Sequence, residues 1–135
     1  MKYLLVLFLV VILANSCGNR NRSGADGSET VTDSTIVIFE KEMHDFGKVG
    51  AGEEIGCRFG FTNAGDQPLV IQDVVAGCGC TNVKYPTKPV QPGEKGAVEV
   101  VFDTRGRQGH QRQMVRVISN GSDYPKVLII RAEVE

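Results

Sequence analysis

The fold is decided by the stretch from Phe59 to Thr81, which reads FGFTNAGDQPLVIQDVVAGCGCT. From four residues before this stretch to its third residue, every second position is apolar: Ile55, Cys57, Phe59 and Phe61. This period of two is typical of a strand with one buried face. Turn residues follow between Asn63 and Pro68. The apolar run from Leu69 to Val75 then predicts a second strand, which we expect to end at the Gly-Cys-Gly-Cys corner.

Further short segments on both sides of this pair have the pattern of strands. We expect them at Ile36–Phe39, with Ile36 and Ile38 among the apolar positions, and at His44–Val49, Thr81–Tyr85, Ala97–Phe102, Gln111–Ser119 and Leu128–Val134. Pro86 and Pro89 place the Thr81–Tyr85 strand at a sheet edge. No sustained helical period occurs after the first sixteen residues. The chain therefore predicts an all-β fold, an antiparallel β-sandwich of about seven strands.

Three connections between these strands have turn chemistry. Gln91-Pro-Gly-Glu94 has the residues of a type II turn, with glycine at the position that needs positive φ. Asp103–Gln108 contains Gly106 and is expected to be a hairpin loop. Asn120-Gly121 is a signal for a tight turn between two strands.

The N-terminal residues 1–16 have the pattern of a secretory signal. Lys2 precedes an apolar run from Tyr3 to Ala14, which is too short to span a bilayer. A cysteine follows at position 17, and this arrangement resembles the lipobox of bacterial lipoproteins, although Asn15 stands where a smaller residue is usual. The resemblance implies removal of residues 1–16 and acylation of Cys17. An uncleaved anchor, or a secretory peptide in which Cys17 has no role, remains an alternative.

Residues 17–35 are polar and are expected to form a flexible linker to a domain over residues 36–135. Removal of Lys2 would leave 14 basic residues against 16 acidic ones, a net charge of −2. This balance argues against nucleic acid as a partner. Stable anchoring needs more than one acyl chain, which a triacylated Cys17 would supply. We therefore expect a protein anchored to the bilayer of a bacterial cell envelope and facing the periplasm.

Several short motifs resemble a known bacterial family. They are His44-Asp45-Phe46-Gly47, Phe61–Gly65, Pro68-Leu69, Cys78–Thr81, Pro92-Gly93, Phe102-Asp103, Gly109 and Ser119-Asn120. Together, over about residues 36–135, they resemble the Ig-like family named domain of unknown function 1573. The resemblance implies an Ig-like sandwich related in shape to sperm-protein and pilus-chaperone-like domains, often on a secreted or lipid-anchored chain, with no established activity.

Cys78 and Cys80 are the residues that invite a chemical hypothesis. In a straight strand their Cα atoms would be about 6.6 Å apart with parallel side chains, too far for a disulfide. Gly79 permits a sharper turn that could join them, and such a small ring would be readily reduced. If Cys17 is acylated, three cysteines remain, and Cys57 is expected to be buried without a partner. Three roles remain open for Cys78 and Cys80. They could be a structural disulfide, either with each other or one of them with Cys57; they could carry out thiol-disulfide exchange; or they could bind a metal.

A metal site is hard to complete from this chain. Zinc would need four ligands, and no second cysteine pair or spaced histidine pair is present. Cu(I) could use the two thiolates, with Met43, His44, His110 or Met114 as additional ligands, but their spacing does not bring them to Cys80. We assign no metal or cofactor. The basic stretch Arg105–Arg112 could contact a phosphate, an acidic glycan or an acidic partner, or be a solvated hairpin.

No catalytic constellation is present in the sequence. We therefore predict a non-enzymatic, lipid-anchored module that binds another envelope or periplasmic protein. The alternative is a thiol-redox or Cu(I)-handling protein that uses Cys78 and Cys80.

Overall fold

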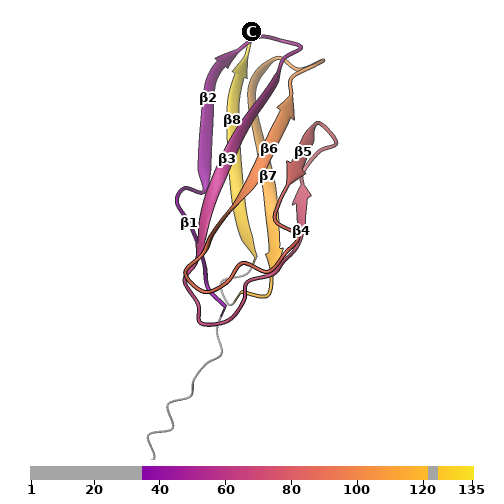
Figure 1. Cartoon of the computed structure of the whole chain (residues 1–135). Coiled ribbons are helices and arrows are strands. Elements are labelled where there is room, and N and C mark those ends of the chain that lie inside the picture. The colour runs from indigo at the N-terminus through magenta and orange to yellow at the C-terminus, as the bar shows by residue number, and fades with distance from the viewer. Residues whose placement is uncertain (1–34, 122–124) are drawn as a thin grey trace, which may run out of the picture. The chain divides into compact units, whose positions relative to one another are not determined.

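The computed structural model describes residues 35–121 and 125–135. They form eight strands: β1 (Val37–Phe39), β2 (Met43–Val49), β3 (Glu54–Asn63), β4 (Ile71–Ala76), β5 (Thr81–Lys84), β6 (Lys95–Asp103), β7 (Gly109–Ser119) and β8 (Lys126–Val134). Two four-stranded sheets, β1-β3-β6-β5 and β2-β8-β7-β4, pack face to face (Figure 1). The expected Ig-like β-sandwich is confirmed, with eight strands. The signal peptide and the linker up to residue 34 lie outside the described residues, and no helix within the described ranges is suited to crossing a membrane.

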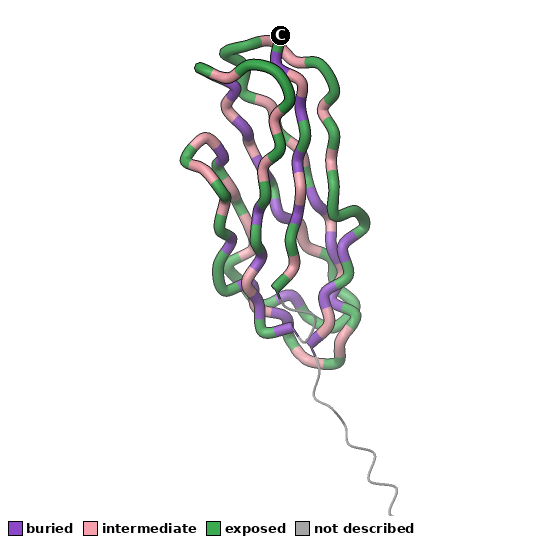
Figure 2. The backbone as a smooth tube through the Cα atoms, turned by 180° about the vertical axis from the view of Figure 1, so that it is seen from behind, coloured by how far each residue is buried: buried purple, intermediate pink, exposed green. Residues whose placement is uncertain are grey.

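The core lies between the two sheets and follows the alternation seen in the sequence. Phe59 and Phe61 of β3 have no exposed surface, and Phe59 pairs directly with Val98 of β6. The opposite layer contributes buried residues from β4, β7 and β8, among them Val115 and Leu128. Figure 2 shows buried and exposed positions alternating along these strands. Burial of one face of each strand therefore sets the register of both sheets.

One pair of strands departs from the antiparallel arrangement that the sequence predicted. β2 runs parallel to β8, whereas the other strand pairs in the described residues are antiparallel. The short link 40–42 carries the chain straight from β1 in one sheet to β2 in the other, so β2 enters beside β8 in the same direction (Figure 1). The pairing of β2 shifts between Asp45 and Lys48, where Gly47 has a φ of +67°. Asp45 Oδ1 accepts a hydrogen bond from the Gly47 amide at 2.8 Å and fixes this bulge.

Two of the strand predictions need correction. β1 begins at Val37 instead of Ile36, with Val37 and Phe39 inward and Ile38 56% exposed. A strand of three residues gives too short a pattern to decide its face, since apolar residues occur at every position from 36 to 39. The second predicted strand begins at Ile71 instead of Leu69, because Leu69 forms an isolated bridge with Val90.

Two of the connections also differ from expectation. The loop between β6 and β7 is not a hairpin, because β6 and β7 belong to different sheets. Asn120 and Gly121 open a connection of residues 120–125 instead of forming a two-residue turn, and Gly121 lacks the positive φ that such a turn requires. The type II turn is confirmed: Gly93 has a φ of +78°, and the Glu94 amide donates to the Gln91 carbonyl at 2.9 Å.

Two buried polar side chains hold the loops at the sheet ends. Asn63 Nδ2 donates to the carbonyls of Gln67 and Val90 at 2.8 and 2.9 Å, and Asn63 Oδ1 accepts from the Gly65 amide at 3.0 Å. Thr104 Oγ1 lies 2.8 Å from the Glu53 amide and 2.9 Å from the Gly50 carbonyl. Asn63 and Gly65, two of the motif residues that carry the family resemblance, therefore have a structural role.

Candidate functional site

Cys78 and Cys80 form a disulfide at the corner where the chain passes from β4, at the edge of one sheet, to β5, at the edge of the other. Their Cα atoms are 5.2 Å apart, closer than in an extended strand, because the backbone bends at Gly79. Both cysteines are half-buried, and Gly79 between them is exposed. The buried Thr81 places its Oγ1 3.5 Å from Cys78 Sγ and 3.7 Å from Cys80 Sγ. The disulfide is thus contacted by the buried Thr81, and both of its cysteines are partly exposed.

Cys57 is a free, half-buried cysteine of β3 that packs against the core. Burial raises the pKa of its thiol to about 11, and the nearby positive charge of Lys41 opposes this shift. Cys57 therefore stays protonated near neutral pH and behaves as the small apolar residue predicted from the strand pattern.

The additional Cu(I) ligands weighed from the sequence are spread over the β2-β8-β7-β4 sheet. Met114 lies next to the corner, since the Gly77 amide donates to its carbonyl at 2.9 Å. His110 lies further along β7, opposite Glu133. Met43 and His44 are on β2, the edge strand furthest from β4 in the order of the sheet. In the described part of the chain, no three His, Cys, Asp or Glu side chains are grouped so that they could hold a metal ion.

His44 instead makes local contacts. Its Nδ1 lies 2.8 Å from Lys41 Nζ, and its ring packs edge-on against Phe46 with the centroids 4.5 Å apart. Burial lowers the pKa of His44, and the charge of Lys41 lowers it further.

The basic stretch Arg105–Arg112 does not act as one patch. Arg105 is neutralised by Asp103, with its Nη2 2.6 Å from Asp103 Oδ2, and it also lies 3.7 Å from Glu54. These hydrogen bonds to Arg105 lower the pKa of Asp103. The Arg107 guanidinium lies over the ring of Phe102 at 5.6 Å. Arg112, at the end of the stretch, lies on β7 and belongs to a different surface.

That surface is the outer face of the β2-β8-β7-β4 sheet, which we call the arginine–methionine face. Its members are Met43, Asp45, Val75, Arg112, Met114, Arg116, Val127, Ile129 and Arg131. Four of the five exposed large apolar side chains in the described chain lie here: Met43 and Met114 at 48%, Val75 at 44% and Val127 at 37%. Single exposed apolar residues are ordinary, but a contiguous group marks an interaction surface.

The strand registers arrange this face in rows. Met43 is opposite Ile129, which is opposite Met114, so one row crosses three strands with apolar side chains alone. In the next row Arg131 has Asp45 on one side and Arg112 on the other. Within the described ranges, Arg112, Arg116 and Arg131 make no ion pair.

The outer face of the other sheet has a different character. There Glu99 of β6 has Arg58 of β3 on one side and Lys84 of β5 on the other, so charges of opposite sign are neighbours. Small residues at Gly56 and Ala97 occupy neighbouring rows. Ile38 is the one exposed large apolar side chain on this face within the described residues, so the larger apolar group lies on the arginine–methionine face.

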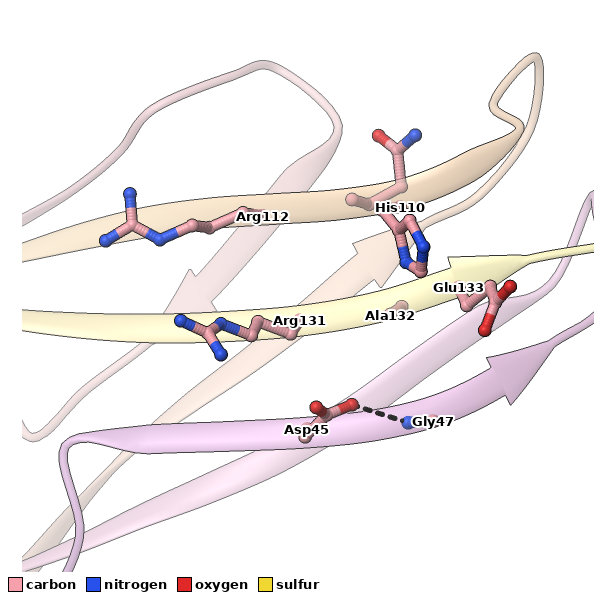
Figure 3. Close-up of a pocket in the computed structure, with 8 residues that line it drawn as sticks. Asp45, Gly47, His110, Arg112, Arg131, Ala132 and Glu133 are labelled. Carbon is pink, nitrogen blue, oxygen red and sulfur yellow. Dashed lines mark hydrogen bonds between the residues drawn. The ribbon is translucent and has the colours of Figure 1, made fainter.

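A groove of about 440 Å³ opens on the arginine–methionine face, lined by residues of β2, β7 and β8. Figure 3 shows Arg112 and Arg131 extended side by side along neighbouring strands, with Asp45 across from Arg131. His110 and Glu133 lie at the other end of the groove. The Asp45 carboxylate turns to the Gly47 amide, leaving the two guanidinium groups without an anionic partner among the described residues.

This face was not predicted from the sequence. The signal was present in β8, where Val127 and Ile129 are apolar although they alternate with the inward residues Leu128 and Ile130. A strand that is apolar on both faces predicts either burial on both sides or a binding surface. What the pattern could not supply is the parallel pairing of β2, which adds Met43 and Asp45 to the same rows.

A family model described as protein of unknown function (DUF1573) matches residues 37–134. No curated protein matches the chain. A solved protein of unknown function from Porphyromonas gingivalis W83 is similar in structure, with a TM-score of 0.66, 16% identity, and 81% of this chain aligned to 51% of that one.

Two further solved structures are similar in fold. The ASH/PapD-like domain 7 of human CEP192 has a TM-score of 0.58 at 12% identity, with 76% and 87% of the two chains covered. The Vibrio cholerae VesB protease has a TM-score of 0.56 at 15% identity, with 77% of this chain aligned to 32% of that one. At these identities the likeness shows a shared fold alone, and the bacterial structures are much longer than the aligned part.

Proposed function

The chain belongs to the DUF1573 family of proteins of unknown function, and from this premise we propose that it is a non-enzymatic, lipid-anchored module that binds another protein of the bacterial cell envelope. The observation that carries this proposal is the arginine–methionine face. Interfaces between proteins are enriched in methionine and arginine at their centres, and this face has both in adjacent rows. Methionine side chains also adapt to irregular surfaces, which suits a docking face.

Anchoring would come from Cys17, which follows a signal-like segment resembling a lipobox. Acyl chains on Cys17 would hold the sandwich near the membrane through the polar segment 18–35, facing the periplasm. The mass of the mature protein, taken from bacterial membranes without reductant, tests this part. We expect residues 1–16 to be absent and acyl mass to be present on Cys17. A mature chain with an unmodified Cys17 would contradict anchoring.

Partner binding is tested by affinity purification of the full chain from membranes in mild detergent. Met114→Glu places a carboxylate in the centre of the face, and because Met114 is exposed this change should not affect folding. Glu99→Gln removes a charge on the outer face of the other sheet without placing like charges together, and it serves as the matched control. We expect the wild type and the control to retain one protein that Met114→Glu loses. Equal recovery by all three, or recovery of nothing, would count against the proposal.

Thiol-disulfide exchange is a second candidate function, because a half-exposed disulfide stands at the corner between two sheet edges. In this reaction a partner dithiol would be oxidised to a disulfide, while Cys78 and Cys80 take up its two electrons and two protons. Equilibration with glutathione redox buffers, followed by thiol counting, tests this role. A disulfide that opens within the range of cellular glutathione potentials supports exchange, and one that resists supports a structural staple.

A further inference from the structure

The central row of the groove contains a like-charge pair. Arg112 of β7 and Arg131 of β8 are direct partners in the strand register, and both are exposed. Like charges directly opposite each other on paired strands are destabilising. Asp45, on the far side of Arg131, makes no ion pair with it. The two guanidinium groups therefore form a place where an added anion would relieve repulsion and gain charge-assisted hydrogen bonds.

The surroundings of this pair narrow the chemistry of the anion. Asp45 and Glu133 also line the groove, so its acidic and arginine side chains balance. A densely anionic surface, such as a phospholipid headgroup layer or a polyanionic glycan, would be repelled by these two carboxylates. A single carboxylate between the arginines would contact both guanidinium groups and bring only one negative charge near Asp45 and Glu133. The row next to the pair is apolar, with Met43, Ile129 and Met114 side by side.

We propose that the Arg112–Arg131 pair is a binding site for a carboxylate side chain of the partner protein. Apolar residues of the partner on either side of that carboxylate cover the neighbouring row of Met43, Ile129 and Met114, which we call the methionine row. This inference rests on the proposed function and specifies the chemistry of the partner's contact segment. The partner segment presents an acidic residue and apolar residues on one side. The paired guanidinium groups each donate hydrogen bonds to the carboxylate oxygens, and the methionine row supplies the apolar contact.

The test uses the full chain in mild detergent and a fluorescein-labelled synthetic peptide in which glutamate alternates with leucine. Fluorescence anisotropy measures its dissociation constant for the wild type, Arg112→Gln, Arg131→Gln and the control Arg58→Gln, which lies on the other sheet. We expect each groove variant to weaken binding about tenfold, the order of magnitude of a well-packed interfacial arginine, and the control to bind like the wild type. A peptide with glutamine in place of glutamate should bind at least tenfold more weakly than the original.

A second readout locates the bound peptide. The chain has three methionines, at positions 1, 43 and 114, so the NMR signals of methyl-labelled methionine can be assigned from single Met→Leu variants. The Met114 signal should shift when the glutamate peptide is added and stay in place when glycerol 3-phosphate is added. Equal binding by the groove variants, equal binding of the glutamine peptide, or a shift with glycerol 3-phosphate alone would overturn the inference.

These outcomes are separable from those of the proposed function. If the affinity purification recovers a partner that Met114→Glu loses but both arginine variants retain, the docking face stands and the carboxylate site is wrong. If the wild type recovers no partner at all, the proposed function fails whatever the peptide does.

Discussion

Replacing Asn63 by alanine tests whether a single buried amide holds one end of the sandwich together. The Asn63 side chain has no exposed surface and makes three hydrogen bonds, to the Gln67 and Val90 carbonyls and from the Gly65 amide. The backbone bonds of position 63 to Glu94 and Gly93 do not depend on the side chain and remain in the variant.

The expected loss follows from these three bonds. Each contributes about 1 kcal/mol net, and its removal leaves a carbonyl or an amide unpaired in a place that water reaches poorly. We expect the free energy of unfolding to fall by about 3 kcal/mol. Typical domains have 5–15 kcal/mol in total, so this is a large fraction of the stability. For a domain of this size it corresponds to a fall in Tm of about 12–24 °C.

Urea denaturation followed by circular dichroism measures this loss, with Asn120→Ala as the matched control. The Asn120 side chain also bridges two backbone groups, donating to the Pro68 carbonyl at 3.0 Å and accepting from the Val70 amide at 2.8 Å, but it is exposed. Water can replace its bonds, so we expect a loss below about 1 kcal/mol. A loss below 1 kcal/mol for Asn63→Ala, or equal losses for both variants, would refute the reasoning.

Three further predictions concern packing and pH. A Cβ at Gly96 would overlap the ring of Phe61, so Gly96→Ala should cost about 1–3 kcal/mol in urea denaturation, whereas Gly79→Ala, with open space around it, should be neutral. Burial raises the pKa of Cys57 from 9.0 to about 11, so the Cys57 thiol is deprotonated at lower pH in the unfolded chain than in the folded one. The free energy of unfolding should therefore fall as pH rises from 9 to 11. At pH 8, iodoacetamide should label native Cys57 about a hundredfold more slowly than it labels Cys57 in the unfolded chain. The pKa of Asp103 is lowered by its arginine neighbour, so its stabilising contribution is present above its ordinary pKa and is lost on acidification below about pH 4; Asp103→Asn should flatten that limb of the stability curve.

The parts of the fold that depend on period-two burial could be predicted from the sequence. β3, β6, β7 and β8 each place apolar residues at every second position, and no other regular structure buries that pattern. The position of β5 at a sheet edge could also be predicted, because prolines follow it in the chain. The buried face of β1 could not be predicted, because three residues carry almost no periodic information.

Pairing between distant strands could not be predicted in the same way. The parallel pairing of β2 with β8 depends on the three-residue link before β2, and its register depends on the bulge at Gly47. The spacing of apolar residues encodes neither feature. The candidate face depends on this pairing, because Met43 and Asp45 join Met114 and Arg131 only through it. Sequence pattern identified the thiol corner, where one residue separates two cysteines, and missed the face, whose members come from four strands.

Site-specific photo-cross-linking in living bacteria tests the central claim most directly. A photoreactive amino acid is placed at Met114 on the arginine–methionine face, or at Arg58 on the outer face of the other sheet, and the envelope proteins are analysed after illumination. We predict one discrete cross-linked species from position 114 and none from position 58. Absence of a species from position 114, or the same species from both positions, would contradict the assignment of this face as the surface through which the protein binds its partner.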